Sequence, residues 1–440
     1  MKKRLLATLL SSTLVMTSLA GCSSKSENGD MVTELTKPIT IEMWHYMNGG
    51  QAEVLNEIIE DFNATNDKGI TVNAISQGSI VDLNKKVISA AQSNSLPAII
   101  NVYPDIATGL IEDKKLVNLS SFINDKNVGM ADEMDDFVDA FIQETSQWNN
   151  GEVYGLPMTK STEVLYVNKN MLESLGYTLE DLEGLTFEKL AEISNKAVTE
   201  LGVAGFGFDS SSNAFISSLK MDGLDFVDSK GTINVDNEWV REYMTFFQKQ
   251  AESGAFRIAG EDKFLSNPFV NQKMLCYQGS SAGYAYLNNG GAFEIAVVEV
   301  PVFEGKDKAV IQQGASLFVT NNVSAEAQYA AYEFVKFATN AENTAKFATA
   351  TGYLPVRKSA VETEIVKNIL NDKTSLYSQV YNVAQKSLPY AYYTPAINNA
   401  QSARTVAQEK YEAFMSGSIT DVEVLVDDIV SQVQTSIGRN

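Results

Sequence analysis

The chain has 440 residues, 44% of them hydrophobic and 20% charged, which is the composition of a globular protein with enough chain for two or three domains. Its 34 Lys and Arg are outnumbered by 55 Asp and Glu, so the net charge is −21 and the sequence lacks the basic surface that a nucleic-acid partner requires. A single histidine, His45, excludes His-ligated metal clusters and makes a Ser-His-Asp relay hard to build, and we expect neither a metal nor another cofactor.

The N-terminus has the features of a bacterial export signal. Basic residues at positions 2–4 precede an apolar stretch over residues 5–20, which is too short for the usual membrane span. The stretch ends in small residues before Cys22, and this pattern resembles the lipobox of bacterial lipoproteins. We therefore expect a lipoprotein signal peptide over residues 1–21, lipidation of Cys22, and a flexible polar tether over residues 22–37. The alternative is an ordinary signal-peptidase site beside a chance cysteine.

Strands and helices alternate after the tether. Apolar patterns predict strands over residues 39–44, 70–75 and 98–103. Apolar residues at helical spacing predict helices over residues 54–62 and 83–91. Because each predicted strand is followed by a helix, the pattern indicates a parallel sheet and an α/β fold class.

Three breaks divide the rest of the chain. A Gly- and Pro-punctuated turn at 151–157 precedes a strand at 164–168, a strand at 295–300 runs into Pro301, and a third break lies at 351–356. Three interdomain crossings predict two discontinuous lobes. The predicted division assigns residues 38–155 plus 302–354 to lobe I and residues 156–301 plus 355–440 to lobe II.

The common catalytic motifs are missing from the sequence. There is no GxxxxGK[ST] phosphate loop, no GxSxG elbow, no HExxH zinc motif and no CxxC pair. Carboxylate pairs such as Asp135 and Asp136 are typical of a solvated face in a chain this acidic. We therefore predict no catalytic residue.

Aromatic residues stand at the ends of predicted strands. The set comprises Trp44, Tyr46, Tyr103, Tyr353 and the segment 390–393. In open α/β sheets ligands bind beyond the carboxyl ends of the strands, so we expect Trp44 and Tyr103 to share one rim. There they could stack on a sugar ring or cover an aliphatic backbone. The alternative is that each aromatic ring packs under the helix that follows it.

Four segments, in chain order, resemble the extracellular solute-binding proteins of family one, which are the capture subunits of ABC importers for sugars and related solutes. They are residues 41–47, 96–103, 314–318 and 351–355. The resemblance runs in patches from about residue 39 to the C-terminus. It implies a type II periplasmic-binding-protein-like fold, in which two α/β lobes joined by three crossings close over a ligand by hinge bending.

The resemblance also implies which residues contact the solute. Carried over one position at a time, they are Trp44, His45, Tyr103, Ser161, Ser280, Ser281, Gly314, Tyr353 and Arg404. Gly314 matches a glycine whose backbone approaches the ligand, and Arg404 matches an arginine that holds a phosphate. Lys160 is a second candidate source of positive charge. For His45 a structural role with one local hydrogen bond is the alternative.

From these observations we expect a monomeric, lipid-anchored subunit on the extracytoplasmic face of the membrane. It would deliver glycerol-3-phosphate, a glycerophosphodiester or a sugar, in that order of preference, to an ABC permease, and it would catalyse no reaction. Two alternatives stay open. One is a lipid-anchored surface hydrolase of glycans or phosphoesters, which needs a carboxylate pair facing the cleft. The other is a solute receptor of the same fold that serves a membrane kinase.

Overall fold

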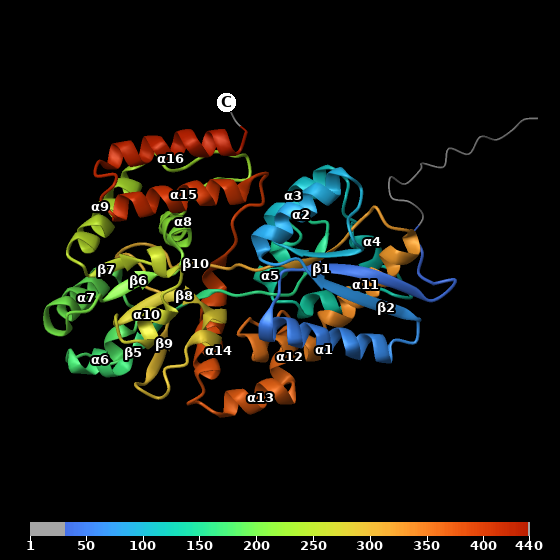
Figure 1. Cartoon of the computed structure of the whole chain (residues 1–440), viewed down its shortest axis with the longest axis horizontal. Helices are drawn as coiled ribbons and strands as arrows, with labels where there is room; N and C mark the ends of the chain where they lie inside the picture. Colours follow the sequence, from blue (N-terminus) through green and yellow to red (C-terminus); the bar gives the residue numbers. More distant parts are fainter. Residues whose placement is uncertain (1–30, 439–440) are drawn as a thin grey trace, which may run out of the picture.

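The computed structural model describes residues 31–438 and places them in two lobes that lie side by side (Figure 1). The predicted signal peptide, the lipidation site Cys22 and most of the predicted tether lie outside the described residues. Among the residues that are described, no helix combines the length and the apolar character needed to cross a bilayer.

Lobe I is built on a five-stranded sheet with the order β2-β1-β3-β11-β4. Its strands are β1 (Ile39–His45), β2 (Ile70–Ser76), β3 (Ile99–Val102), β4 (Gly155–Pro157) and β11 (Ser316–Val319). Its helices are α1 (Gly49–Thr65), α2 (Ile80–Gln92), α3 (Pro104–Glu112), α4 (Ser120–Ile123), α5 (Asp139–Glu144), α11 (Ala325–Ala338) and α12 (Ala341–Thr351). One core cluster lies on the α1 and α11 face of the sheet and a second lies under α2 and α3.

Local sequence explains the elements that lead to the cleft. Alternate residues of β1, among them Ile41 and Met43, are buried, so one face of the strand enters the core. Ser79 and Asp82 form a capping box that starts α2, since each side chain accepts a hydrogen bond from the other residue's backbone N–H. Pro104 is the first residue of α3, where its missing N–H costs no hydrogen bond.

The sheet of lobe I is mixed, whereas the alternation of elements predicts a parallel one. β1 pairs in parallel with β2 and β3, but β11 is antiparallel to both β3 and β4. β11 reaches the sheet only after the chain has built most of lobe II, so no short right-handed crossover fixes its direction. The α/β class of the fold is nevertheless confirmed.

Lobe II repeats this plan with the strand order β7-β6-β8-β5-β9. Its strands are β5 (Glu163–Asn168), β6 (Phe206–Phe208), β7 (Phe256–Ile258), β8 (Cys276–Ser280) and β9 (Ile295–Val298). Its helices are α6 (Lys169–Ser174), α7 (Phe187–Leu201), α8 (Ser211–Met221), α9 (Glu238–Glu252), α10 (Ser266–Val270), α15 (Ala400–Met415) and α16 (Val422–Ser436). α15 and α16 pack on each other and on α9, and α15 also contacts α8 (Figure 1).

Hydrogen bonds join the three crossings at the hinge. Ser161 and Gln313 exchange both backbone hydrogen bonds at 2.9 Å, and the Leu354 N–H donates to the Lys160 carbonyl at 2.7 Å. The short strands β10 (Val310–Ile311) and β12 (Ala391–Tyr392) pair in parallel beside them. The predicted two-lobe fold with three crossings is therefore confirmed.

The predicted lobe boundaries need correction. β4 places residues 156 and 157 in the sheet of lobe I. Phe303 is buried in the core of lobe II, so the chain does not return to lobe I at residue 302. Val356 is buried in the core of lobe I, and the chain leaves that lobe later than residue 354, through α13 (Glu364–Asn371) and α14 (Leu376–Ser387). Breaks in a sequence show where strands end, whereas apolar packing decides which lobe a segment joins.

Candidate functional site

A pocket lies where the two lobes meet the hinge, and we call it the Arg404 pocket. Its lining includes Tyr103 and Asp105 after β3, Glu144 at the end of α5, Gln312 and Gly314 on the second crossing, and Arg404 on α15. Both lobes and the hinge therefore contribute to it. A solute in this pocket would contact every part of the molecule that moves when the lobes close.

Arg404 supplies the positive charge of the pocket. Its guanidinium donates hydrogen bonds to Asn213 Oδ1 and, at 3.4 Å, to Ser212 Oγ. Within residues 31–438 it forms no ion pair, although Asp105 and Glu163 act on it through space. Burial lowers the pKa of Arg404, but an arginine stays cationic at neutral pH. A partly buried cation whose partners are an amide and a hydroxyl is suited to an anionic ligand.

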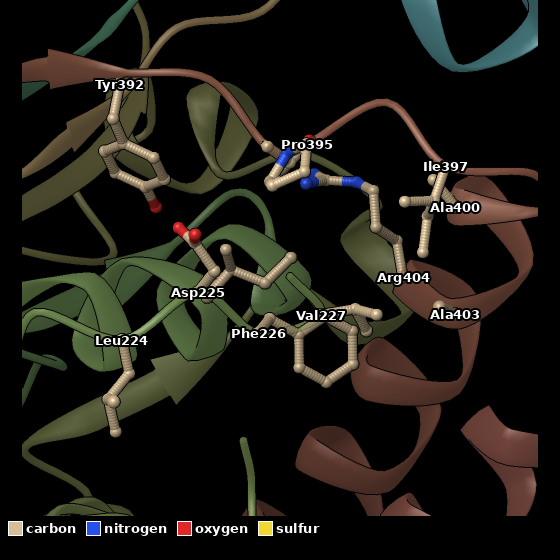
Figure 2. Close-up of a pocket in the computed structure, with 12 residues that line it drawn as sticks. Leu224, Asp225, Phe226, Val227, Tyr392, Pro395, Ile397, Ala400, Ala403 and Arg404 are labelled. Carbon is tan, nitrogen blue, oxygen red and sulfur yellow. The ribbon is translucent and has the colours of Figure 1, made fainter. Parts of the chain in front are cut away.

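Figure 2 shows the residues that surround the Arg404 side chain on the side away from the Arg404 pocket. The side chain extends from α15 toward Pro395, and Ile397 and Ala400 lie near its aliphatic part. Phe226 lines the same region from lobe II. This apolar surrounding lowers the local dielectric around the Arg404 side chain, which strengthens its interaction with an anion.

Three tyrosines meet near the Arg404 pocket on the side of lobe I. The Tyr46 hydroxyl lies 3.1 Å from Thr159 Oγ1 and 3.5 Å from the Tyr353 hydroxyl. The rings of Tyr46 and Tyr103 meet edge to face with centroids 6.5 Å apart. Burial raises the pKa of all three tyrosines, so each hydroxyl is neutral and can donate or accept a hydrogen bond. Tyr46 was visible in the sequence as a strand-end aromatic, but its pairing with Tyr353 was not.

Trp44 and His45 lie away from the two cleft pockets and contact the interior of lobe I. Trp44 packs against the core under α2 and α3, its Nε1 donates to the Glu42 carboxylate, and it lines neither cleft pocket. His45 is buried, and its Nδ1 accepts a hydrogen bond from the Met47 N–H at 3.1 Å. Burial lowers the pKa of His45 to about 4, so the ring is neutral at physiological pH. This is the local hydrogen bond expected of a structural histidine.

A second cleft pocket, the Asp209 pocket, lies on the lobe II side. Ser161, Glu163, Asp209, Phe264 and Ser280 are among its lining residues. Phe264 is 65% exposed. Desolvation raises the pKa of Asp209 to about 7, with a smaller effect of the nearby Glu163 carboxylate.

A hydrogen-bond network joins the two pockets. Asn213 Nδ2 donates to Glu163 Oε1 at 2.7 Å and to Gln313 Oε1 at 2.8 Å, while Asn213 Oδ1 accepts from Arg404. Gln278 Nε2 donates to Glu163 Oε2 at 2.7 Å. Burial raises the pKa of Glu163, and these amides oppose the shift. The network fixes the orientation of the Arg404 guanidinium from the lobe II side.

The two serines implied by the resemblance, Ser280 and Ser281, lie in different surroundings. Ser280 lines the Asp209 pocket, and its Oγ accepts from the Ala282 N–H at the start of the 3-10 helix η4 (Ser281–Tyr286). Ser281 is fully buried, and its Oγ accepts from the Thr162 N–H at 3.3 Å. Ser281 therefore holds the first crossing against lobe II.

Gly314 and Lys160 belong to the hinge. Gly314 has φ +130, and a Cβ there would lie 1.6 Å from the Thr159 carbonyl oxygen, so the backbone itself excludes a larger residue. Lys160 is fully buried, and its Nζ lies 2.5 Å from Glu144 Oε2 and 3.0 Å from the Gly314 carbonyl oxygen. The interpretation of Lys160 as a second positive group for the ligand is therefore wrong, because its charge is already paired.

Several polar residues of the cleft were not singled out in the sequence. They are Asp105, Glu144, Glu163, Asp209, Asn213, Gln312 and Gln313. A signal was present for two of them, since Gln312 and Gln313 interrupt an apolar strand immediately before Gly314. The others lie on helices and strands where polar residues are common, and only the fold brings them together.

Comparison with known proteins agrees with this architecture. Residues 57–373 match the family model of the bacterial extracellular solute-binding protein. The sn-glycerol-3-phosphate-binding periplasmic protein UgpB of Rhizobium meliloti (strain 1021) is 23% identical over 414 residues, which span 90% of this chain and 94% of that protein.

Two solved structures share the fold. UgpB from Mycobacterium tuberculosis in complex with glycerophosphocholine has a TM-score of 0.77 and 21% identity, covering 92% of this chain and 99% of that one. The ABC substrate-binding protein Lmo0181 from Listeria monocytogenes in complex with cycloalternan has a TM-score of 0.77 and 15% identity, covering 92% and 100%. Since the family model spans well over half of the sequence, the predicted relationship is confirmed, and the chain belongs to the family of bacterial extracellular solute-binding proteins.

Proposed function

We propose that this protein is the substrate-binding subunit of an ABC importer and that its cargo is glycerol-3-phosphate, a glycerophosphodiester or a sugar, in that order of preference. The observation that supports an anionic cargo is the Arg404 guanidinium, which lies partly buried in the cleft and, within residues 31–438, donates hydrogen bonds to Asn213 and Ser212 without forming an ion pair. The names of the UgpB relatives support glycerol-3-phosphate as the first choice. The protein would bind and release its cargo unchanged.

The charge of the whole chain makes this local cation necessary. A net charge of −21 gives a field that repels an anion, so capture depends on groups within the cleft. Tyr46 and Tyr103 of lobe I would receive the solute, and Arg404 of lobe II would bind its phosphate when the lobes close. Because the solute contacts both lobes, its binding favours the closed form, which would then dock on the permease.

Anchoring at Cys22 is part of the proposal. Cleavage before Cys22 and acylation of its sulfur would hold the subunit beside the permease on the extracytoplasmic face. Cell fractionation tests it, since the Cys22→Ser variant should leave the membrane fraction while the native chain stays there. Equal distribution of both proteins would contradict the lipid anchor.

Calorimetry tests the cargo. The exported chain is titrated with glycerol-3-phosphate, glycerophosphocholine and a maltodextrin series. We expect Arg404→Ala to weaken glycerol-3-phosphate binding about 100-fold, as for a lost charge-assisted hydrogen bond to a phosphate. Arg241→Ala is the matched control, because Arg241 pairs with Glu423 and Asp236 on the surface of lobe II. Anion affinity that survives Arg404→Ala would overturn the phosphate role.

One observation favours a different function. Glu163 and Asp209 line the same pocket, and burial raises the pKa of both, as in the acid of a hydrolytic carboxylate pair. Turnover of chromogenic phosphoesters and glycosides tests this alternative. Activity that is lost in Asp209→Asn would support a surface hydrolase, and absence of turnover by the native chain would exclude it for these substrates.

A further inference from the structure

Gln312 is held rigidly at the hinge. It lies one residue after β10, it is 2% exposed, and its backbone N–H donates to the Tyr392 carbonyl at 2.8 Å. Its side-chain Nε2 donates to the Ala140 carbonyl at 2.7 Å and to Glu144 Oε2 at 3.3 Å. Because two acceptors face the amide nitrogen, the amide cannot turn over without placing its oxygen against them.

The other end of this amide has no partner. Within residues 31–438 Gln312 Oε1 accepts no hydrogen bond, although it is buried. A buried acceptor left unsatisfied destabilises the folded chain. Other buried polar atoms share this condition, but of those residues only Gln312 lines the Arg404 pocket. The wall of the pocket thus holds a cationic donor, Arg404, and a residue whose buried amide oxygen lacks a donor.

We propose that Gln312 Oε1 accepts a hydrogen bond from a hydroxyl of the bound solute, so that Gln312 determines specificity among the anions that Arg404 attracts. This inference rests on the proposed function. A phosphate ester with a neighbouring hydroxyl satisfies both groups at once. An ester without a hydroxyl leaves Oε1 unpaired and also covers it, and sites of this kind discriminate strongly against the analogue that lacks the donor.

The test compares two ligands that share the phosphate. Glycerol-3-phosphate and propyl phosphate are titrated into the native chain and into Gln312→Met, which has similar volume but no amide. The native protein should prefer glycerol-3-phosphate, and Gln312→Met should reduce that preference about tenfold, mainly through weaker binding of glycerol-3-phosphate. A merely structural role would weaken both ligands equally.

A control variant removes another unpartnered atom. The Tyr332 hydroxyl is buried in the core of lobe I without a partner among the described residues, and Tyr332→Phe should leave the preference unchanged. Gln312→Met also loses the bonds to Ala140 and Glu144 and could fail to fold. A crystal structure of the native chain with glycerol-3-phosphate is therefore the second measurement, with a ligand hydroxyl expected within hydrogen-bond distance of Oε1.

The outcomes separate the two proposals. If the phosphates bind but the preference is unchanged in Gln312→Met, or the crystal shows no hydroxyl at Oε1, the role of Gln312 is wrong and the proposed function stands. If neither phosphate binds the native chain, the proposed function fails and the role of Gln312 fails with it.

Discussion

Lys160 Nζ lies 2.5 Å from Glu144 Oε2, and both side chains are buried where the first crossing passes the end of α5. The same ammonium donates to the Gly314 carbonyl at 3.0 Å, and Gln312 donates to the same carboxylate at 3.3 Å. One ion pair therefore ties two of the three crossings to lobe I. The Lys160 ammonium is therefore an element of the hinge, although Glu144 also lines the Arg404 pocket.

We predict that Lys160→Met lowers the free energy of unfolding by about 3 kcal/mol, because it leaves the Glu144 carboxylate buried without its cation. Replacing both residues, in Lys160→Met with Glu144→Leu, should recover part of that loss. Urea unfolding measures both effects. Lys358→Met is the matched control, since Lys358 and Asp139 form an exposed pair that should contribute less than about 1 kcal/mol. Equal losses for Lys160→Met and Lys358→Met would contradict the prediction.

Gly314 gives a prediction about backbone geometry. Its φ of +130 is one that L side chains rarely adopt, and an added Cβ would meet the Thr159 carbonyl at 1.6 Å. Gly314→Ala should therefore destabilise the chain by about 3 kcal/mol and shift the first crossing. Gly151→Ala is the control, since Gly151 also has a positive φ but nothing lies within 4 Å of its added Cβ. Similar urea midpoints for the two variants would contradict the prediction, because they would show that the Thr159 backbone can move away from the added Cβ without loss of stability.

Much of the fold could be predicted because its signals are local. The strands at 39–45 and 70–76 show period-two burial, and breaker residues mark the first crossing near residue 157. The direction of β11 and the lobe that Phe303 joins could not be predicted. Both depend on where the chain returns after building lobe II, and no short segment of sequence encodes that.

Prediction of the site was limited for a similar reason. Arg404 and Tyr103 were found through motifs, and they do line one pocket. Asn213 lies in a segment whose local sequence carries no sign of a binding site, and the only sign at Gln312 is a polar interruption of an apolar strand. Both residues reach the cleft only because the fold brings three distant parts of the chain together. The resemblance assigns Ser281 to the ligand together with Ser280, whereas in the structure Ser281 Oγ accepts a hydrogen bond from the Thr162 N–H of the first crossing.

Asp209 gives a prediction about pH. Its pKa rises from 3.8 to about 7 on folding, so the folded chain holds this proton more tightly than the unfolded chain does. Protonation of Asp209 therefore stabilises the folded chain. This contribution to the free energy of unfolding is complete below pH 4 and is lost as the pH rises from about 4 to 7. Asp209→Asn should therefore unfold at a higher temperature than the native chain at pH 8, by an amount that shrinks as the pH falls. The gain at pH 8 is on the order of 2 kcal/mol.

Thermal unfolding at pH 8, 6 and 4.5 measures this difference. Asp132→Asn, an exposed residue of lobe I, is the control and should change little at any of the three pH values. A constant difference between Asp209→Asn and the native chain across the range would mean that protonation of Asp209 is not its cause.

Neighbouring aromatic residues at the end of β1 give the last prediction. Neither Tyr46 nor Trp44 lines the two cleft pockets. Tyr46 lies within hydrogen-bond distance of Thr159 and contacts the ring of Tyr103, which lines the Arg404 pocket, whereas Trp44 packs beneath α2 and α3. Tyr46→Ala should therefore weaken glycerol-3-phosphate binding about tenfold, since it removes a buried ring and a hydroxyl that orients Thr159. Trp44→Phe should leave the affinity within about twofold, because it changes a packing contact outside the pockets. Calorimetry of both variants decides between the two aromatics. A larger loss of affinity for Trp44→Phe than for Tyr46→Ala would mean that Trp44 contacts the ligand, as the sequence alone predicts.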